Sequence, residues 1–153
     1  MMRLISAAVI ATMFTASAAQ AEQWRAVSER TDEAPRVVMF VDQDSLTRSG
    51  NTAKANVMTV VEPSAVKSGG WNVSVIYREV DCSGKRTRQL TSKYYTYSKI
   101  IEDDKTPNDW ADINEGSMVD GVAKVMCGTR DYHTGKVTDP SNFAFELFNL
   151  LPI

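Results

Sequence analysis

The chain contains two cysteines, Cys82 and Cys127. In an oxidising compartment two cysteines most simply form one disulfide. Closing a loop of this length stabilises a fold by about 4 kcal/mol. A zinc site or a redox pair is the alternative, but the sequence has no Cys-x-x-Cys motif and only one histidine, too few ligands for a zinc site. We therefore expect a structural bridge between two segments that are far apart in the sequence.

The first 21 residues have the features of a secretory signal sequence. Arg3 supplies a positive start, residues 4–14 are mostly apolar, and Ala19-Gln20-Ala21 places small residues where a signal peptidase cuts. A membrane anchor is the alternative, but the apolar run is shorter than the roughly 20 residues that cross a bilayer. We expect cleavage after Ala21, a mature chain without a transmembrane segment, and a periplasmic or secreted location. Because no cysteine lies at the junction, a lipoprotein is not indicated.

The length that remains, residues 22–153, suits a single domain. Removing residues 1–21, in which Arg3 is the one charged side chain, changes the formal net charge from −2 to −3. Proteins that bind nucleic acid usually have a clear excess of basic residues. The charge therefore argues against a nucleic-acid partner.

Residues 24–97 have the patterns of β-strands separated by turns. Val37–Val41 is a continuous apolar run too short for a helix, which suits a central strand covered on both faces. The longest candidate, residues 71–82, changes its apolar face near Ile76, so we expect either a bulge there or partial cover on both faces. The threonines and tyrosines of residues 87–97 are typical of an exposed or edge strand.

Two helices are predicted after these strands, which makes the fold class α+β. Ser117 is a good N-cap with Asp120 in the first turn, and apolar residues then recur at helical spacing until Gly128. Gly121 weakens this helix by about 1 kcal/mol relative to alanine. The expected bridge would join the end of a strand to the end of this helix, and so fasten the helix to a sheet face.

The second predicted helix lies in a C-terminal extension, residues 128–153. Asp139 can cap it, Pro140 suits its first position and Pro152 ends it. Its apolar side chains cover more than half of the circumference: Phe143, Phe145, Leu147, Phe148, Leu150 and Leu151. Because a surface helix normally keeps a broader polar face, we expect this one to pack on two sides, against its own domain and against something else.

A series of residues and short motifs follows in order between residues 24 and 127. They are Trp24, Phe40-Val41-Asp42, Ser45-Leu46, Gly50-Asn51, Asp81-Cys82, Arg88, Leu90, Tyr95, Trp110, Gly116-Ser117 and Cys127. In these features the chain resembles the bacterial surface-adhesin protein E family. The resemblance implies an antiparallel sheet, of about five to six strands here, with the helix before Cys127 tethered to one face by the disulfide. It also implies an exported protein that is often dimeric. The member that gives the family its name binds host matrix and plasma proteins.

No residues combine into a catalytic, cofactor-binding or metal site, and we predict that the protein is not an enzyme. His133 is the single histidine, and a turn between two helices explains it better than a catalytic or haem-ligand role. Glu102, Asp103 and Asp104 lack the alternating oxygen ligands of a calcium loop, so a solvated loop is expected there.

Basic side chains gather around the predicted hairpin beside Cys82: Arg78, Lys85, Arg86, Arg88 and Lys93. They can face an anionic partner, such as a glycosaminoglycan or an acidic protein surface, or they can simply be solvated. Tyr94, Tyr95 and Tyr97 can likewise line a recognition patch or pack on the sheet. The sequence leaves both alternatives open.

Two classes of function fit these expectations. The first is a non-catalytic binding module of the bacterial cell envelope that recognises a protein or extracellular-matrix partner. The second is a periplasmic structural or assembly protein that docks on a partner, or on a second copy as a homodimer, through the apolar C-terminal helix.

Overall fold

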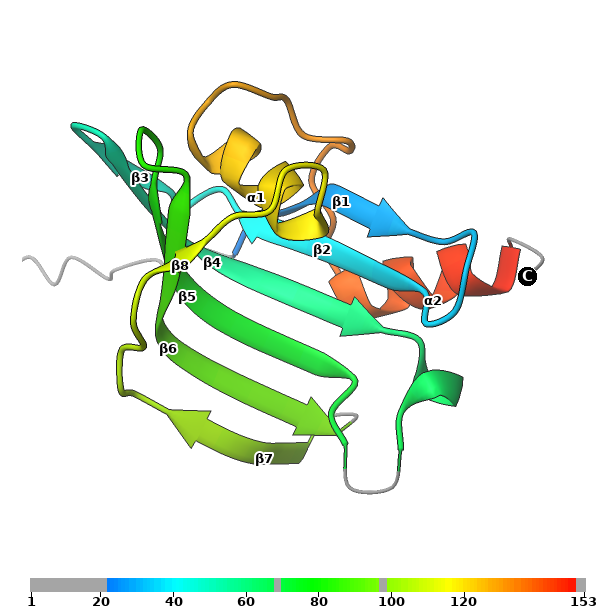
Figure 1. The fold of residues 1–153 in the computed structure, drawn as a ribbon. Helices are drawn as coiled ribbons and strands as arrows, with labels where there is room; N and C mark the ends of the chain where they lie inside the picture. Colours follow the sequence, from blue (N-terminus) through cyan, green and yellow to red (C-terminus); the bar gives the residue numbers. More distant parts are fainter. Residues whose placement is uncertain (1–21, 68–69, 97–98, 151–153) are drawn as a thin grey trace, which may run out of the picture.

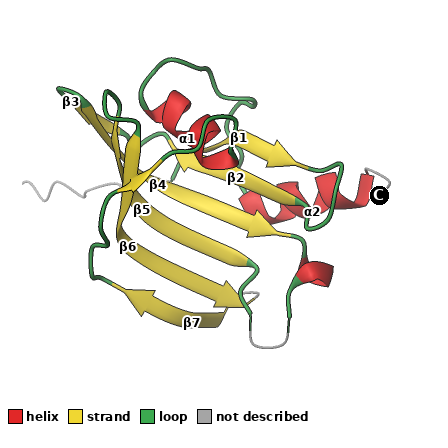
Figure 2. Cartoon of the chain, viewed as in Figure 1, coloured by secondary structure: helices red, strands yellow, loops and turns green. Residues whose placement is uncertain are grey.

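The computed structural model of the chain describes residues 22–67, 70–96 and 99–150. Within these residues an antiparallel sheet of eight strands is flanked by two α-helices (Figures 1 and 2). The strands are β1 (Trp24–Arg30), β2 (Val37–Asp42), β3 (Thr47–Ser49), β4 (Thr52–Val61), β5 (Val73–Asp81), β6 (Arg86–Thr96), β7 (Lys99–Asp104) and β8 (Ala111–Asp112). The helices are α1 (Met118–Met126) and α2 (Pro140–Leu150), with a short 3₁₀ turn at Pro63–Ala65.

The main path through the sheet is β1-β2-β4-β5-β6-β7, with β3 paired to β4 and β8 paired to β6. This confirms the predicted α+β class and the antiparallel sheet, with six strands on the main path and two short strands beside it. The predicted signal sequence at residues 1–21 lies outside the described residues, as do Tyr97, Leu151 and Pro152.

Strand β2 is buried along its whole length, as its unbroken apolar run predicts. Val37, Met39 and Val41 belong to the hydrophobic core on the α1 side, whereas Val38 and Phe40 belong to the core on the α2 side. This two-sided burial follows from the alternation of side chains in a strand. The sheet is therefore covered on both faces in the half that contains β1, β2 and β4.

Helix α1 begins and ends where the sequence predicts. The Ser117 hydroxyl accepts a hydrogen bond from the Asp120 backbone N–H, and Gly128 follows the helix with a positive φ of 76°. Gly121 has a packing role that the sequence did not reveal. A Cβ atom there would lie 3.1 Å from Ser28 Oγ on β1, so glycine lets the helix approach the sheet closely.

The predicted disulfide is present between Cys82 and Cys127. Cys82 follows the last residue of β5, and Cys127 is the C-cap of α1. The bridge therefore fastens the C-terminal end of α1 to the sheet.

The register of β5 with β6 shifts between Tyr77 and Arg78, but the extra residue there is Leu90 of β6, and β5 pairs with β4 without a shift. The change of apolar face near Ile76 therefore reflects the second alternative, partial cover of β5 on both faces. The expectation of an edge position for residues 87–97 is wrong, because β6 pairs with β5 on one side and with β7 and β8 on the other. The edge strand is β7, which contains Glu102, Asp103 and Asp104. These carboxylates are exposed as expected, but they lie on a strand and not in a loop.

Helix α2 begins at Pro140, and Asp139 accepts a hydrogen bond from the Asn142 backbone N–H, as its sequence predicts. The helical spacing of the sequence predicts that Phe143 and Leu147 lie on the stripe that faces the core, but other residues are buried most deeply. Ala144 (0% exposed) and Phe148 (3% exposed) are buried against the sheet, while Phe143, Phe145 and Leu147 pack around them and are partly buried. A small residue at the contact, Ala144, allows the helix to lie close to β2 and β4.

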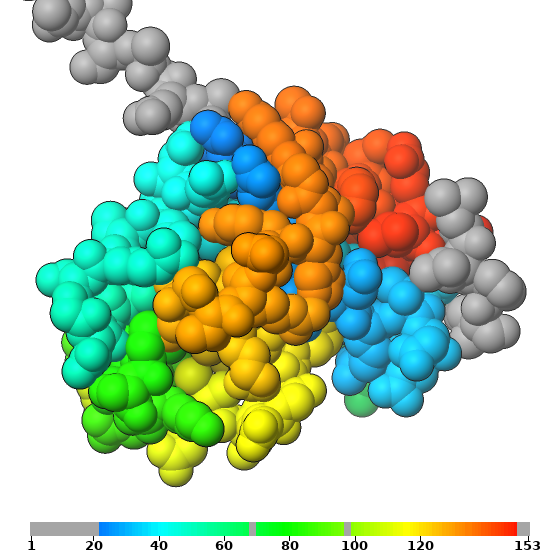
Figure 3. Space-filling view, turned by 90° about the horizontal axis from the view of Figure 1, so that it is seen from above, coloured from blue at the N-terminus to red at the C-terminus, as the bar shows by residue number. Residues whose placement is uncertain are grey.

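A strap, residues 129–138, connects α1 to α2 and passes over β1 (Figure 3). The backbone N–H groups of His133 and Val137 donate hydrogen bonds to the carbonyls of Ala26 and Trp24, with an N–O distance of 2.8 Å in each. The Thr134 hydroxyl accepts a bond of 3.0 Å from the Ala26 N–H. The strap thus occupies the outer edge of β1. His133 lies in it through backbone pairing, with its ring 3.8 Å from Glu29.

Candidate interaction surface

The sheet ends on its other side at β7, where the chain leaves an open edge, residues 99–104. All six residues are exposed, and β6 is the one strand that pairs with β7 among the described residues. Ile100 (51% exposed) and Ile101 (44% exposed) are the large apolar side chains that remain exposed in the described part of the chain. Figure 1 shows β7 at the margin of the sheet, away from both helices.

The charges of the open edge have little compensation. Lys99 is followed by three carboxylates, and for Glu102 and Asp103 the described residues provide no ion pair. Asp104 accepts a hydrogen bond from the Thr106 backbone N–H. Lys93 of β6 lies directly opposite Asp103, so one cation partly offsets these charges. The edge therefore combines exposed apolar surface with a net negative charge.

A groove of about 570 Å³ lies on the α2 side of the sheet and leads toward this edge. Its wall includes Trp24, Met58, Val75, Tyr77, Lys93 and Tyr95. Tyr95 stands directly opposite Ile100, so both side chains project on the same face. The apolar surface of the groove thus continues to the sheet margin.

The structure does not gather the five basic residues of the sequence prediction into one patch. Arg78 is buried and opposite Ala55, which places it on the α1 face, whereas Lys93 lies in the groove on the α2 face. Burial lowers the pKa of Arg78. Lys85 lines a separate pocket beside the disulfide.

The remaining two basic residues are paired with carboxylates across the β5–β6 hairpin. Arg86 contacts Asp81 at 3.0 Å, and Arg88 contacts Glu79 at 2.6 Å. Both guanidinium groups lie near the Trp110 ring. Hydrogen bonds from the Gly84 N–H and then from Arg86 lower the pKa of Asp81 to about 2. Burial raises the pKa of Glu79, but hydrogen bonds from Arg88 and Lys54 outweigh it and leave the pKa lowered.

The predicted tyrosine patch is divided as well. Tyr94 packs against Trp71, with ring centroids 5.4 Å apart, and its neighbour Tyr95 lines the groove on the α2 side. Consecutive residues of a strand point to opposite faces, so these two rings do not form one surface.

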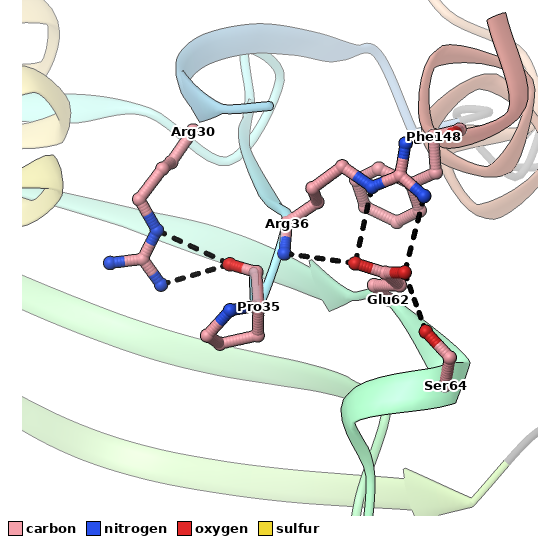
Figure 4. A network of polar contacts seen from close by, with 6 residues as sticks. All are labelled: Arg30, Pro35, Arg36, Glu62, Ser64 and Phe148. Carbon is pink, nitrogen blue, oxygen red and sulfur yellow. Dashed lines mark hydrogen bonds and ion pairs between the residues drawn. The ribbon is translucent and has the colours of Figure 1, made fainter. Parts of the chain in front are cut away.

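A buried ion pair anchors the C-terminal end of α2 to the sheet (Figure 4). Arg36 lies just before β2, and Glu62 lies just after β4. The Nε and Nη2 groups of Arg36 each donate a hydrogen bond of 3.1 Å to the Glu62 carboxylate. Ser64 also donates to Glu62, and Arg36 Nη1 donates to the backbone carbonyl of Phe148. The Arg36 guanidinium also lies over the Phe148 ring, 5.7 Å from its centroid. One arginine thus joins two strands and a helix terminus.

Hydrogen bonds from Arg36, followed by that from Ser64, lower the pKa of Glu62 from 4.5 to about 2. Because the folded pKa lies below the ordinary value, the ionised carboxylate stabilises the fold fully above about pH 4.5, and this contribution disappears as the pH falls toward 2. We expect the stability difference between the wild type and Glu62→Gln to be constant above pH 5.5 and to shrink below pH 4.5. Urea unfolding across this range measures it. A difference that does not change with pH would contradict this assignment.

The open edge and the strap are the features that sequence reasoning missed. Ile100 and Ile101 give a detectable signal, since two adjacent β-branched apolar residues stand among charged ones. The strap gives almost none, because its pairing with β1 uses backbone groups.

The geometry defines a class of protein: a small α+β module with a disulfide-tethered helix and one open sheet edge. The family model for surface-adhesin protein E matches residues 24–128. The chain belongs to the surface-adhesin protein E family. No curated protein and no solved structure matches it.

The family match supports a surface-adhesin-like protein, and the disulfide fits an exported protein. The match ends at residue 128, so the strap and α2 lie outside it. In the part of the chain that the structure describes, no helix has the length and apolar character needed to span a membrane.

Proposed function

We propose that this protein is an exported, non-catalytic binding module of the cell envelope that recognises a protein partner, such as a matrix protein. The signal sequence at residues 1–21, cleaved after Ala21 without lipid attachment, would deliver residues 22–153 as a single domain. The observation that carries the proposal is the open edge, because two adjacent exposed isoleucines, Ile100 and Ile101, lie on a strand whose outer backbone groups pair with no described segment.

The anionic-ligand alternative receives less support from the geometry. A glycosaminoglycan needs a continuous positive surface. Arg86 and Arg88 are paired with Asp81 and Glu79, and Arg78 is buried. Of the five basic residues, the exposed Lys85 and Lys93 and the buried Arg78 make no ion pair with the described residues. The negatively charged strand β7 is a better candidate for the contact surface, and it fits a protein partner.

The test is saturable binding of purified residues 22–153 to a panel of purified matrix and plasma proteins. We expect at least one partner to bind. The double variant Ile100→Asp/Ile101→Asp should weaken that binding at least tenfold, because burying an unpaired charge in an apolar contact costs free energy. The matched control is Lys136→Asp, an exposed strap position beside the opposite edge. Equal binding by both variants would exclude the β7 surface, and no binding to any protein of the panel would exclude the adhesive function.

A periplasmic assembly protein is the second candidate, and the outer side of α2 favours it. Phe143, Phe145 and Leu147 are partly buried by the protein itself, which leaves part of their apolar surface for a partner or for a homodimer. Protease accessibility on intact cells separates the candidates: surface exposure supports adhesion, and protection until the outer membrane is opened supports assembly. Replacing Phe145 with serine should then change the mass in solution only if α2 mediates association.

A further inference from the structure

The two edges of the sheet differ in how their backbone groups are used. The chain's own strap pairs with the outer edge of β1 through His133, Thr134 and Val137. No described segment pairs with the outer edge of β7. An edge strand with unpaired amide and carbonyl groups is a template for one more strand. One edge is therefore closed within the chain, and the other is available to a partner.

The side chains of the open edge define which strand fits there. Ile100 and Ile101 supply apolar surface at the register shift of β7, and Glu102, Asp103 and Asp104 follow them. With Lys99, the strand carries a formal charge of −2. Like charges opposed across a strand pair are destabilising, and opposite charges are stabilising.

This charge discriminates between occupants. A second copy of β7 would bring another charge of −2 into the same seam. Parallel in-register pairing would oppose like charges at residues 102–104, and antiparallel pairing would still leave two uncompensated carboxylates on each copy, so self-pairing is disfavoured. A segment that alternates apolar residues with lysine or arginine would cover the isoleucines and pair with the carboxylates. The same carboxylates thus repel identical chains and select a cationic one, as natural edges do when they limit aggregation.

We propose that the outer edge of β7 accepts an extended, cationic and partly apolar segment of a partner protein as an additional antiparallel or parallel strand. The inference rests on the proposed binding function and specifies its mode. Backbone hydrogen bonds to residues 99–104 give the affinity, and contacts with the isoleucines and carboxylates give the selectivity.

The test uses three synthetic eight-residue peptides with blocked ends. One alternates valine and lysine, the second has the same sequence with alternate backbone nitrogens methylated, and the third has glutamate in place of lysine. We expect the first to bind residues 22–153 at least tenfold more tightly than either of the others. Bound peptide should slow hydrogen exchange of the amides of residues 99–104, measured by NMR, and leave the β1 amides unchanged.

A charge-reversal variant provides the matched control. Glu102→Lys/Asp103→Lys changes two exposed side chains, so the fold should persist, which circular dichroism checks. We expect this variant to prefer the glutamate peptide over the lysine peptide. Retention of the original preference would overturn the charge selection.

Two further outcomes would overturn the strand addition. Equal binding of the methylated peptide would show contact through side chains alone. Concentration-dependent protection of the β7 amides without peptide would identify a second copy as the occupant. In both cases binding to the protein panel can persist, so the proposed function would survive. Loss of panel binding with peptide binding intact would instead remove the adhesive function.

Discussion

Replacing Cys82 and Cys127 together with serine is expected to lower the free energy of unfolding by about 4 kcal/mol. The two residues are 45 positions apart, and the bridge restricts the unfolded chain to conformations in which they remain joined. In the folded state it ties the end of β5 to the C-cap of α1. Without it, α1 depends on the apolar contacts of Val122, Val125 and Met126. Denaturant unfolding of the oxidised wild type and the variant measures the loss.

Two comparisons separate the bridge from the other effects of substitution. The wild type in reductant should match the double serine variant, because both have an open chain. Ser117→Ala, which removes the N-cap of the same helix, should cost only about 1 kcal/mol. If the double variant stays within 1 kcal/mol of the oxidised wild type, the bridge contributes little and packing alone holds α1 to the sheet.

The parts of the fold that sequence predicted correctly are those with a local chemical signal. The buried run of β2, the Ser117 and Asp139 caps and Gly128 each follow from residue types at adjacent positions. Strand β7 gave only a weak signal, its adjacent pair Ile100-Ile101. A strand is recognised by alternation only when one of its faces is buried, and both faces of β7 are exposed. Glu102, Asp103 and Asp104 therefore suggested a solvated loop.

The arrangement of the predicted basic cluster was harder to predict because it depends on strand register. Arg86 and Arg88 are neutralised by Asp81 and Glu79, which face them across the β5–β6 hairpin. The extra residue of β6, Leu90, puts Arg86 and Arg88 on the face that also carries Lys93, and its position cannot be read from composition. Arg78 points to the opposite face of β5, so residues that are close in the sequence lie on two faces of the sheet.

The Arg36–Glu62 pair shows the same limit at longer range. The partners are 26 residues apart, and the Phe148 carbonyl is 112 residues from Arg36, so no local pattern connects them. Their contact exists because β2 and β4 are neighbours and α2 ends above that junction. The C-terminal extension is therefore integrated into the fold by this buried polar network and by the strap's hydrogen bonds to β1, in addition to its apolar contacts.

Arg36→Ala is expected to lower the free energy of unfolding by 3–5 kcal/mol, roughly the cost of removing one partner of a buried ion pair. The variant leaves the Glu62 carboxylate buried without its main cation, and it also removes the hydrogen bond to the Phe148 carbonyl. Urea unfolding measures the global loss. Relative to the wild type, amide hydrogen exchange should speed up most in the last turn of α2, because this turn loses its anchoring bond from Arg36 to the Phe148 carbonyl.

The double variant Arg36→Met/Glu62→Leu separates charge from anchoring. Replacing a buried pair by apolar residues of similar size is often neutral, so most of the lost stability should return. The last turn of α2 should nevertheless exchange faster than in the wild type, since methionine cannot donate to the Phe148 carbonyl. Arg30→Ala, which removes bonds to the Pro35 carbonyl on the same side of the sheet, should change neither measurement by more than about 1 kcal/mol. An Arg36→Ala variant as stable as Arg30→Ala would mean that α2 is held by its apolar contacts and not by the ion pair.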